Sequence, residues 1–248
     1  MMLASAWLIW PAVLLAGALI GASGIGGVLM VPLLNRLGEV PLQGAIAASS
    51  LAFALPALVA LGPLRRQREL AAQCIPLLCG ALAGAAVGAL LVYRLPGGYL
   101  MIGVTALVVF AGVRGVFAKP RPAIEDAPAL GRTAWLVLGF VVGAGSALTG
   151  TGGPVLVLPL LLLLRQPVLL AVVAAQAIQL PVALASSAVH ASAGRLDLEL
   201  AALCGALLLF GSIVGQRAAR RLDARQLQRL VSMLLLVVGG WFAWLLVA

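Results

Sequence analysis

Two glycine-rich groups with interspersed hydroxyl side chains, each set inside a long apolar stretch, have the clearest potential for chemistry. The first reads GASGIGGVLMVPLL from Gly21, and the second reads GAGSALTGTGGPVLVLPLLL from Gly143. Glycines let the chain reverse tightly and bring unpaired N–H groups close to whatever lies there. In lipid, unpaired backbone groups persist only where protein or a polar cavity satisfies them. The repeated break therefore predicts a pathway or binding site within the membrane.

Each break precedes apolar sequence that predicts a half-helix, beginning near Gly27 and near Gly153, and Pro154 suits a first helical turn. Helix N-termini carry partial positive charge and free N–H donors, so an anion is the natural occupant. Ser146, in the turn before the second break, could add a hydroxyl donor. The predicted substrate-binding residues of the breaks are Ser23, Gly24, Gly26, Gly27, Thr149, Gly150, Thr151, Gly152 and Gly153. The alternative is structural: glycines allow close helix packing, and hydroxyls bond to the preceding turn.

A helix with unusual polarity follows each break. Ser49 and Ser50 precede Pro56, and Gln176 and Gln179, three residues apart and hence on one helical face, precede Pro181. Burying these groups without partners is costly, so they line either a hydrogen-bonded interface or the substrate path. The sequence does not decide between the two for the glutamines and favours an interface for the serines. All four belong to the predicted site.

His190 is the only histidine and lies near the end of the second of these helices, with Arg195 and Asp197 beyond it. Imidazole changes charge near neutral pH, so proton coupling is one interpretation, although an interfacial, hydrogen-bonded role is commoner. The chain contains no HExxH, GxSxG or P-loop lysine motif, and its cysteines lack metal-ligand spacing. We therefore expect neither an enzyme nor a cofactor or metal site.

The composition predicts an integral membrane protein. Of 248 residues, 63% are hydrophobic and 9% are charged, and the mean hydropathy is +1.17. Apolar runs of about 20 residues suffice for helices that cross a bilayer. The net charge of +9 comes from basic residues scattered between these runs. It therefore indicates orientation in a lipid bilayer and not nucleic-acid binding.

The predicted fold is all-α and polytopic, with two inverted repeats that each contain a re-entrant glycine-broken hairpin and three transmembrane helices. The broken segments are residues 7–35 and 133–165. The predicted full-length helices are residues 43–62, 70–93, 97–117, 167–193, 198–217 and 226–247.

An internal duplication supports the repeats. Adding 127 to a residue number carries Pro32 onto Pro159, and Gly84 and Gly88 onto Gly211 and Gly215. The predicted domains are a first membrane repeat at 1–118, a cytoplasmic linker at 119–132 and a second membrane repeat at 133–248.

The distribution of positive charge predicts the topology. If each broken segment is a hairpin that enters and leaves on one side of the membrane, Arg36, Arg94 and Arg195 lie on one side of the membrane. The other thirteen Lys/Arg residues then lie on the opposite side. If both segments cross completely, the division is eight to eight. Cytoplasmic loops carry the excess of Lys and Arg, which favours the hairpins, places both termini outside and places the linker in the cytoplasm. The hairpins then enter from opposite faces, as in many transporters built from inverted repeats.

The order of these motifs, with a proline after each glycine group and HASAGRLDL after the second polar helix, resembles the TauE/SafE family of membrane transporters. The resemblance covers about Trp7 to Val247. It implies glycine motifs at Gly24, Gly26, Gly27 and Pro32, and at Gly150, Gly152, Gly153 and Pro159. Pro154 replaces the last glycine of the second motif, the first cluster is one residue short, and Ser49-Ser50 and Ala175-Gln176 stand where the family often has Thr-Ser.

The resemblance implies secondary transport of small sulfur-containing anions, such as sulfite, sulfoacetate or organosulfonates, across the bacterial inner membrane. Export is the expected direction. The alternatives are a passive anion channel and a membrane structural or assembly subunit. The sequence leaves open whether the chain forms a homo-oligomer.

The topology is testable with a single cysteine in the linker. In an Ala123→Cys variant, a membrane-impermeant thiol reagent is expected to label the new cysteine only from the cytoplasmic side, because residues 119–132 are predicted to lie there. Labelling of intact cells from outside would contradict the hairpin topology.

Overall fold

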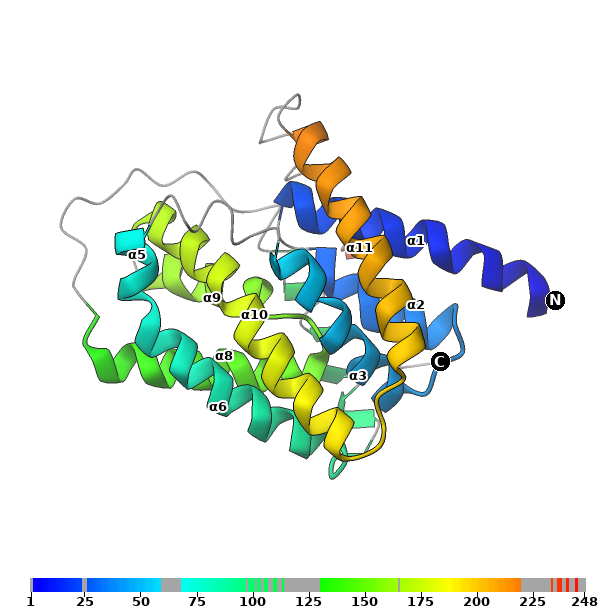
Figure 1. The fold of residues 1–248 in the computed structure, drawn as a ribbon, viewed down its shortest axis with the longest axis horizontal. Helices are drawn as coiled ribbons and strands as arrows, with labels where there is room; N and C mark the ends of the chain where they lie inside the picture. Colours follow the sequence, from blue (N-terminus) through cyan, green and yellow to red (C-terminus); the bar gives the residue numbers. More distant parts are fainter. Residues whose placement is uncertain are drawn as a thin grey trace.

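All regular secondary structure in the described part of the chain is helical, and no strand occurs in it. The computed structural model describes residues 2–23, 26–58, 68–96, 98–100, 130–164 and 166–219, with isolated positions between 102 and 113 and between 233 and 244. The elements in Figure 1 are α1 (Met2–Ser23), η1 (Gly26–Leu29), α2 (Met30–Arg36), α3 (Leu42–Ala52), α5 (Arg68–Gln73), α6 (Ile75–Val92), α8 (Arg132–Thr149), α9 (Pro154–Leu163), α10 (Val168–Ser192) and α11 (Leu198–Ala219). The predicted all-α class is confirmed.

Four described helices are long and apolar enough to cross a membrane. These candidate spans are Ile75–Val92, Arg132–Thr149, Leu170–Ser192 and Leu198–Ala218. Three of them match predicted helices 70–93, 167–193 and 198–217, whereas the fourth is the first arm of the broken segment 133–165. Predicted helix 226–247 and most of 97–117 lie outside the described residues.

Prolines explain where two predicted helices differ from the structure. Segment 70–93 is divided at Cys74 into α5 and α6, because Pro76 has no N–H with which to continue the helix from α5. Helix α3 is interrupted at Phe53 before a last helical stretch at 54–58, because Pro56 cannot donate to the carbonyl of Ala52. In contrast, α10 continues without a break through Pro181.

Both predicted breaks are present, and both predicted half-helix starts are confirmed. Helix α9 begins at Pro154, directly after Gly153, and η1 begins at Gly26 and is followed by α2 from Met30. The arms on either side of the second break differ in length. With 18 residues in α8 and 10 in α9, they extend about 27 Å and about 15 Å at 1.5 Å per residue.

Glycines bring two helix pairs into backbone contact. On α6, a Cβ at Gly84 or Gly88 would overlap the backbone of Phe140 or Ala144 in α8. On α11, a Cβ at Gly215 would likewise overlap the carbonyl of Ala18 in α1. Small residues that permit such an approach are typical of helix interfaces in membranes. In each pair, the residue numbers of the contacting positions increase in the same direction along both helices. Helix α6 therefore runs parallel to α8, and α11 runs parallel to α1.

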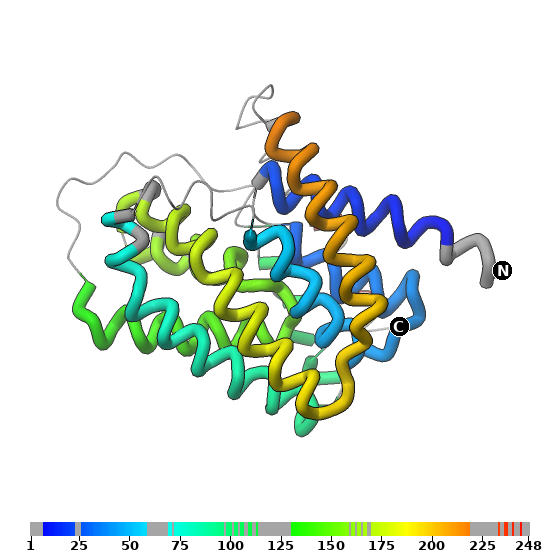
Figure 2. The backbone as a smooth tube through the Cα atoms, in the orientation of Figure 1, coloured from blue at the N-terminus to red at the C-terminus, as the bar shows by residue number. Residues whose placement is uncertain are grey.

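The contacts also fix how the two pairs are oriented. Tyr93, which directly follows α6, bonds to His190 near the end of α10. Leu78, near the start of α6, packs against Val173 and Ala177 in the first half of α10, so α6 and α10 are parallel. Gln43, at the start of α3, bonds to Arg195 just beyond α10, so α3 runs the opposite way. Helices α6, α8 and α10 therefore run in one direction, and α1, α3 and α11 run in the other, as the tube in Figure 2 shows. The starts of α8 and α10 lie at one end of the molecule, and the starts of α1 and α3 lie at the other.

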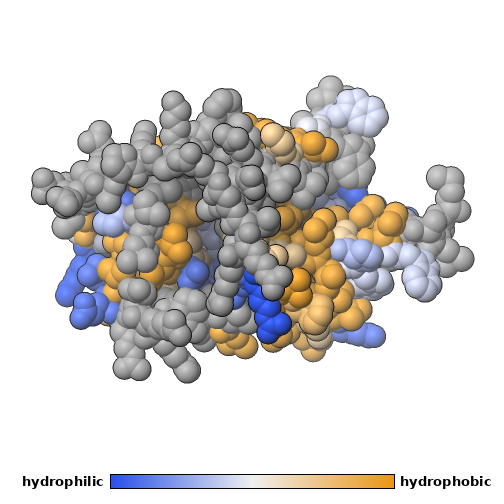
Figure 3. All heavy atoms as spheres, turned by 90° about the horizontal axis from the view of Figure 1, so that it is seen from above, coloured by the Kyte–Doolittle hydropathy of each residue, from blue (hydrophilic) through white to orange (hydrophobic). Residues whose placement is uncertain are grey.

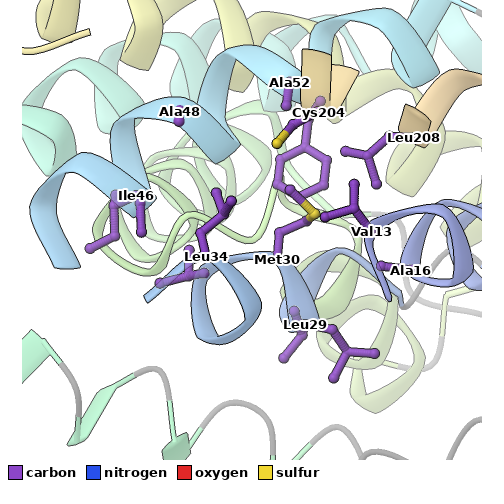
Figure 4. Packing of buried hydrophobic residues seen from close by; sticks show 14 of the residues in the cluster. Val13, Ala16, Leu29, Met30, Leu34, Ile46, Ala48, Ala52, Cys204 and Leu208 are labelled. Carbon is purple, nitrogen blue, oxygen red and sulfur yellow. The ribbon is translucent and has the colours of Figure 1, made fainter. Parts of the chain in front are cut away.

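The hydrophobic core forms two main clusters, and each combines helices from both sequence halves. One joins α1, η1, α2 and α3 with α11; Figure 4 shows Met30 among side chains such as Val13, Leu34 and Cys204. The other joins α6 with α8, α9 and α10. The first cluster also includes Val155 of α9 and Ala183 of α10, so helices from both halves of the chain contribute to each cluster. The repeat boundaries at 1–118 and 133–248 and the linker at 119–132 remain a prediction.

The outer surface of the bundle is largely apolar. Leu82, Phe140, Leu184 and Phe210 are among many large hydrophobic side chains that face outward. Figure 3 shows that much of the described surface on that face is hydrophobic, with hydrophilic patches toward both ends of the molecule. Such a surface suits lipid as its solvent and not water.

The close helix contacts predict that alanine substitution destabilises the protein at Gly84 but not at Gly98. Gly84→Ala places a methyl group against the Phe140 carbonyl, and such overpacking is expected to reduce the unfolding free energy by about 1–3 kcal/mol. Thermal unfolding in detergent measures the effect. Gly98→Ala is the matched control, because no atom lies within 4 Å of its added Cβ, and a change within about 0.5 kcal/mol is expected. Equal melting temperatures for both variants would contradict the packing.

Candidate functional site

Three glycines in left-handed conformations form the reversal between α8 and α9. Their φ angles are 64° at Gly150, 79° at Gly152 and 105° at Gly153. Residues with a Cβ are strained at such angles, whereas glycine is not. Gly150 ends α8, and the N–H of Thr151 then donates to the Ser146 carbonyl at 3.1 Å. We call residues 150–153 the second tip.

The start of α9 presents unused N–H groups. The N–H groups of Leu156 and Val157 both donate to the Gly153 carbonyl at 3.1 Å. Pro154 has no N–H, and those of Gly152, Gly153 and Val155 have no acceptor in the described part of the chain. These groups lie at the positive end of the helix dipole, in residues that are buried. Such a set of neighbouring donors suits a negatively charged oxygen.

Three of the predicted hydroxyl ligands use their hydrogens locally. Thr149 Oγ1 donates to the Gly145 carbonyl at 2.7 Å, and Thr151 Oγ1 is then the donor in its 3.1 Å contact with Thr149 Oγ1. Ser50 Oγ donates to the Ile46 carbonyl at 2.9 Å. These residues match the structural alternative of bonding to the preceding turn.

Two other hydroxyls have no partner. Ser146 and Ser49 are 1% and 0% exposed, and the Oγ atoms of both are buried without a hydrogen bond. A Cβ at Gly153 would lie 3.8 Å from Ser146 Oγ, so this hydroxyl is next to the start of α9. Unsatisfied buried hydroxyls cost about 1–3 kcal/mol each, which a ligand at the tip would recover.

Ser49 lies on the face of α3 that packs against the second tip. Ile46, three residues earlier, has its Cα 3.2 Å from a Cβ built at Gly150, and the ring of Phe53, four residues later, lies 3.2 Å from one built at Gly152. Spacings of three and four residues place all three side chains on one helical face. Ser49 therefore adds a second unpartnered hydroxyl to the same region.

Phe53 brings the two helix breaks together. Its ring lies 3.1 Å from a Cβ built at Gly27 and also contacts the Gly152 position. The Thr151 carbonyl oxygen lies 2.9 Å from the same Gly27 position. The described parts of both breaks thus meet around one buried aromatic ring. Gly24 and the side chain of Ser23, both predicted ligands, lie outside the described residues.

The second tip lies near the middle of α10. Ile178 Cγ2 lies 2.9 Å from a Cβ built at Gly153, and Ile178 is the eleventh of 25 residues in α10. If α10 crosses the bilayer, this contact places the tip near the midplane.

Gln176 and Gln179 flank this contact on α10 but are not placed against the tip. Gln179 is 7% exposed and Gln176 is half-buried, and neither amide has a partner in the described part of the chain. No group of acidic, cysteine or histidine side chains that could hold a metal ion occurs among the described residues.

No sequence pattern predicts the role of Phe53, because a single phenylalanine before a proline is common in an apolar chain. Ser146 stands in the turn before the break, but Thr149 and Thr151 were the apparent ligands. Only the backbone geometry distinguishes a hydroxyl bonded to its own helix from one that faces the tip.

The left-handed turn predicts that an added methyl group destabilises the protein at Gly150 but not at Gly44. Gly150→Ala is expected to lower stability by about 1–2 kcal/mol through its φ angle alone, and its Cβ would also lie 2.6 Å from a Val31 methyl. Gly44→Ala, in α3 with its nearest neighbour at 3.4 Å, is expected to be neutral or stabilising by up to about 1 kcal/mol. Thermal unfolding in detergent compares the two; unchanged stability in Gly150→Ala would show that the tip has another conformation.

Comparisons with known proteins identify the family. The family model described as "Sulfite exporter TauE/SafE" matches residues 9–242, which is nearly the whole chain. No curated protein and no solved structure matches. With its apolar helices, the chain is a multi-pass membrane protein, and it belongs to the TauE/SafE family of sulfite exporters.

Proposed function

We propose that this protein is a secondary transporter that exports small sulfur-containing anions, such as sulfite, sulfoacetate or other organosulfonates. The anion binds near the midplane, at the N-terminus of α9. The observation that carries this proposal is the set of unused donors there: three backbone N–H groups and the buried Ser146 hydroxyl. Membership of the sulfite exporter family supports the choice of a sulfur oxyanion.

The donor set suits an anion better than a cation or a neutral ligand. Hydrogen bonds to a charged acceptor contribute roughly twice as much as those between neutral groups, and more so where water is excluded. No acidic side chain lies in the described tips, so nothing there repels a negative charge. The ten-residue α9 adds its dipole.

The helix directions support hairpins that enter from opposite faces. If each broken segment crossed the membrane completely, α6 and α10 would run antiparallel, whereas their contacts make them parallel. With both segments as hairpins, Arg36, Arg94 and Arg195 lie outside, while the thirteen other basic residues lie inside. This topology belongs to the proposal, together with the bacterial inner membrane as its location.

The membrane potential supplies a driving force for export. Moving one negative charge out of an inside-negative cell is favourable by about 2.3 kcal/mol per 100 mV. Alternating access needs one structural element to rock against another around the bound anion. The two core clusters are the proposed moving parts.

Removal of one hydroxyl tests the site. Proteoliposomes loaded with radiolabelled sulfite are expected to show saturable efflux, and Ser146→Ala is expected to weaken sulfite binding about tenfold, since a hydrogen bond to a charged group contributes about 1.5–3 kcal/mol. Ser212→Ala is the matched control, because that buried hydroxyl already donates to the Leu209 carbonyl at 2.8 Å. Binding is measured by titration calorimetry in detergent.

The outcomes separate the competing functions. Unitary currents in place of saturable efflux would indicate a channel. If sulfite, sulfate, thiosulfate, sulfoacetate and taurine all leave the melting temperature unchanged, the structural-subunit alternative is favoured. Equal sulfite affinity in Ser146→Ala and Ser212→Ala would refute the binding site.

A further inference from the structure

A second polar cluster lies where α6, α10 and α3 meet, away from the tips. Tyr93, which follows α6, has its hydroxyl 2.6 Å from His190 Nδ1, with the rings edge to face at 5.5 Å. The Arg195 guanidinium lies 5.0 Å from the centre of the Tyr93 ring and donates to Gln43 Oε1 at 3.3 Å. Gln43 in turn donates to the Val92 carbonyl at 3.2 Å. We call Gln43, Tyr93, His190 and Arg195 the end cluster.

The chain reversal after α10 holds Arg195 in place. Gly194 is left-handed, with φ of 64°, and the Arg195 N–H donates to the His190 carbonyl at 3.1 Å. Asp197 then caps α11, since its Oδ1 accepts the Leu200 N–H at 2.9 Å. In the Gly-x-x-Asp sequence, Gly194 thus forms the turn, and the Asp197 carboxylate accepts a hydrogen bond from the first turn of α11.

Arg195 consequently keeps its charge available. Its side chain is exposed, and it has no carboxylate partner among the described residues. One of its five N–H donors contacts Gln43, and the others are open to a ligand. A guanidinium has the planar fork that binds oxyanions through paired hydrogen bonds.

His190 supplies a second unused group. The side chain is 0% exposed, and its Nε2 has no hydrogen-bond partner. Either atom can be the donor in this bond, depending on the imidazole tautomer; with no other protein acceptor for the hydroxyl in the described part of the chain, we assign Tyr93 as the donor to Nδ1. Burial raises the pKa of the Tyr93 phenol, and Arg195 lowers it only in part, so the phenol remains protonated at neutral pH. With Nδ1 accepting, the neutral imidazole carries its hydrogen on Nε2, which is a donor without an acceptor.

Polar residues on α10 connect this cluster to the level of the second tip. Gln176, Gln179, Ser186, Ser187 and His190 are the polar side chains between 176 and 190, and their helical spacing places them all on one side of α10 within an arc of about 100°. Ser187 Oγ is also buried without a partner. Along the helix axis this arc extends from the level of Ile178 to His190, but Ile178, which contacts Gly153, points about 130° away from the middle of the arc, so the polar face and the tip contact lie on different sides of α10.

We propose that Arg195 and His190 form a second oxyanion site at the C-terminal end of α10, away from the second tip. Arg195 attracts the anion, and His190 Nε2–H donates to it. Tyr93 is a positioning residue that fixes the imidazole. This inference rests on the proposed function, because it assigns the same sulfur oxyanion to both sites.

Titration calorimetry with sulfite in detergent tests the second site. The wild-type protein is expected to bind two anions per chain, and Arg195→Gln and His190→Gln are each expected to retain only one at the concentrations used, with affinity at the lost site at least about tenfold weaker. Arg94→Gln is the matched control. Arg94 is exposed at the same end, one residue after Tyr93, and its side chain makes no polar contact in the described part of the chain. This control is expected to keep both sites.

Transport provides a readout that a merely structural role would not change. For sulfite presented at the Arg195 face of proteoliposomes, Arg195→Gln is expected to raise KM about tenfold with kcat nearly unchanged. Arg195→Lys should restore part of the loss because it keeps the charge. Tyr93→Phe retains the ring beneath Arg195 but removes the hydrogen bond to His190, so it should alter KM less than His190→Gln does.

The stoichiometries distinguish failure of this inference from failure of the proposed function. If the wild type binds one anion that Ser146→Ala weakens and Arg195→Gln does not, the end cluster is not a site, and the proposed function stands. If the one bound anion responds to Arg195→Gln and not to Ser146→Ala, the end cluster is the site, and the tip is not. If wild-type protein binds no sulfite, both proposals fail.

Discussion

Unsatisfied backbone at the start of α9 is the constraint on which the rest of the structure depends. Gly152, Gly153 and Val155 present N–H groups to a buried space in a bundle whose surface is apolar, where water is scarce. Such groups are costly unless a ligand or trapped water accepts from them. The surrounding helices therefore have two tasks: they hold the break in place, and they leave its N–H groups without a protein acceptor in the described part of the chain. Ser146 and Ser49 supply hydroxyls there that no helix carbonyl uses.

Glycine contacts perform the first task. Parallel packing of α6 on α8 and of α1 on α11 brings backbone against backbone, which fixes the first arm of each break over several turns. Because α6 comes from the first half of the chain and α11 from the second, each broken segment is braced by a helix from the other half. Phe53, a member of the first cluster, contacts the Gly27 and Gly152 positions, so the two breaks share one buried ring.

Much of this architecture was predictable from the sequence, because it follows from local chemistry. Apolar runs gave the helices, the glycine groups gave the breaks, and Pro154 marked the start of α9. Side-chain roles were less accessible: Thr149 and Thr151 were the obvious ligands, yet their hydroxyls bond within the turn, while Ser146 remains free. Which hydroxyl faces the tip depends on φ angles at Gly150 and Gly153, and no residue pattern specifies those. The joining of Tyr93 to His190, 97 positions apart, likewise depends on how α6 lies along α10.

The most direct test of the central claim is a structure of the protein with selenite, a heavier analogue of sulfite that is located by anomalous scattering. The account predicts an anomalous peak at the start of α9, with selenite oxygens within about 3 Å of Ser146 Oγ and the Gly153 N–H. A peak elsewhere, with these donors bonded to water or to protein carbonyls, would contradict it.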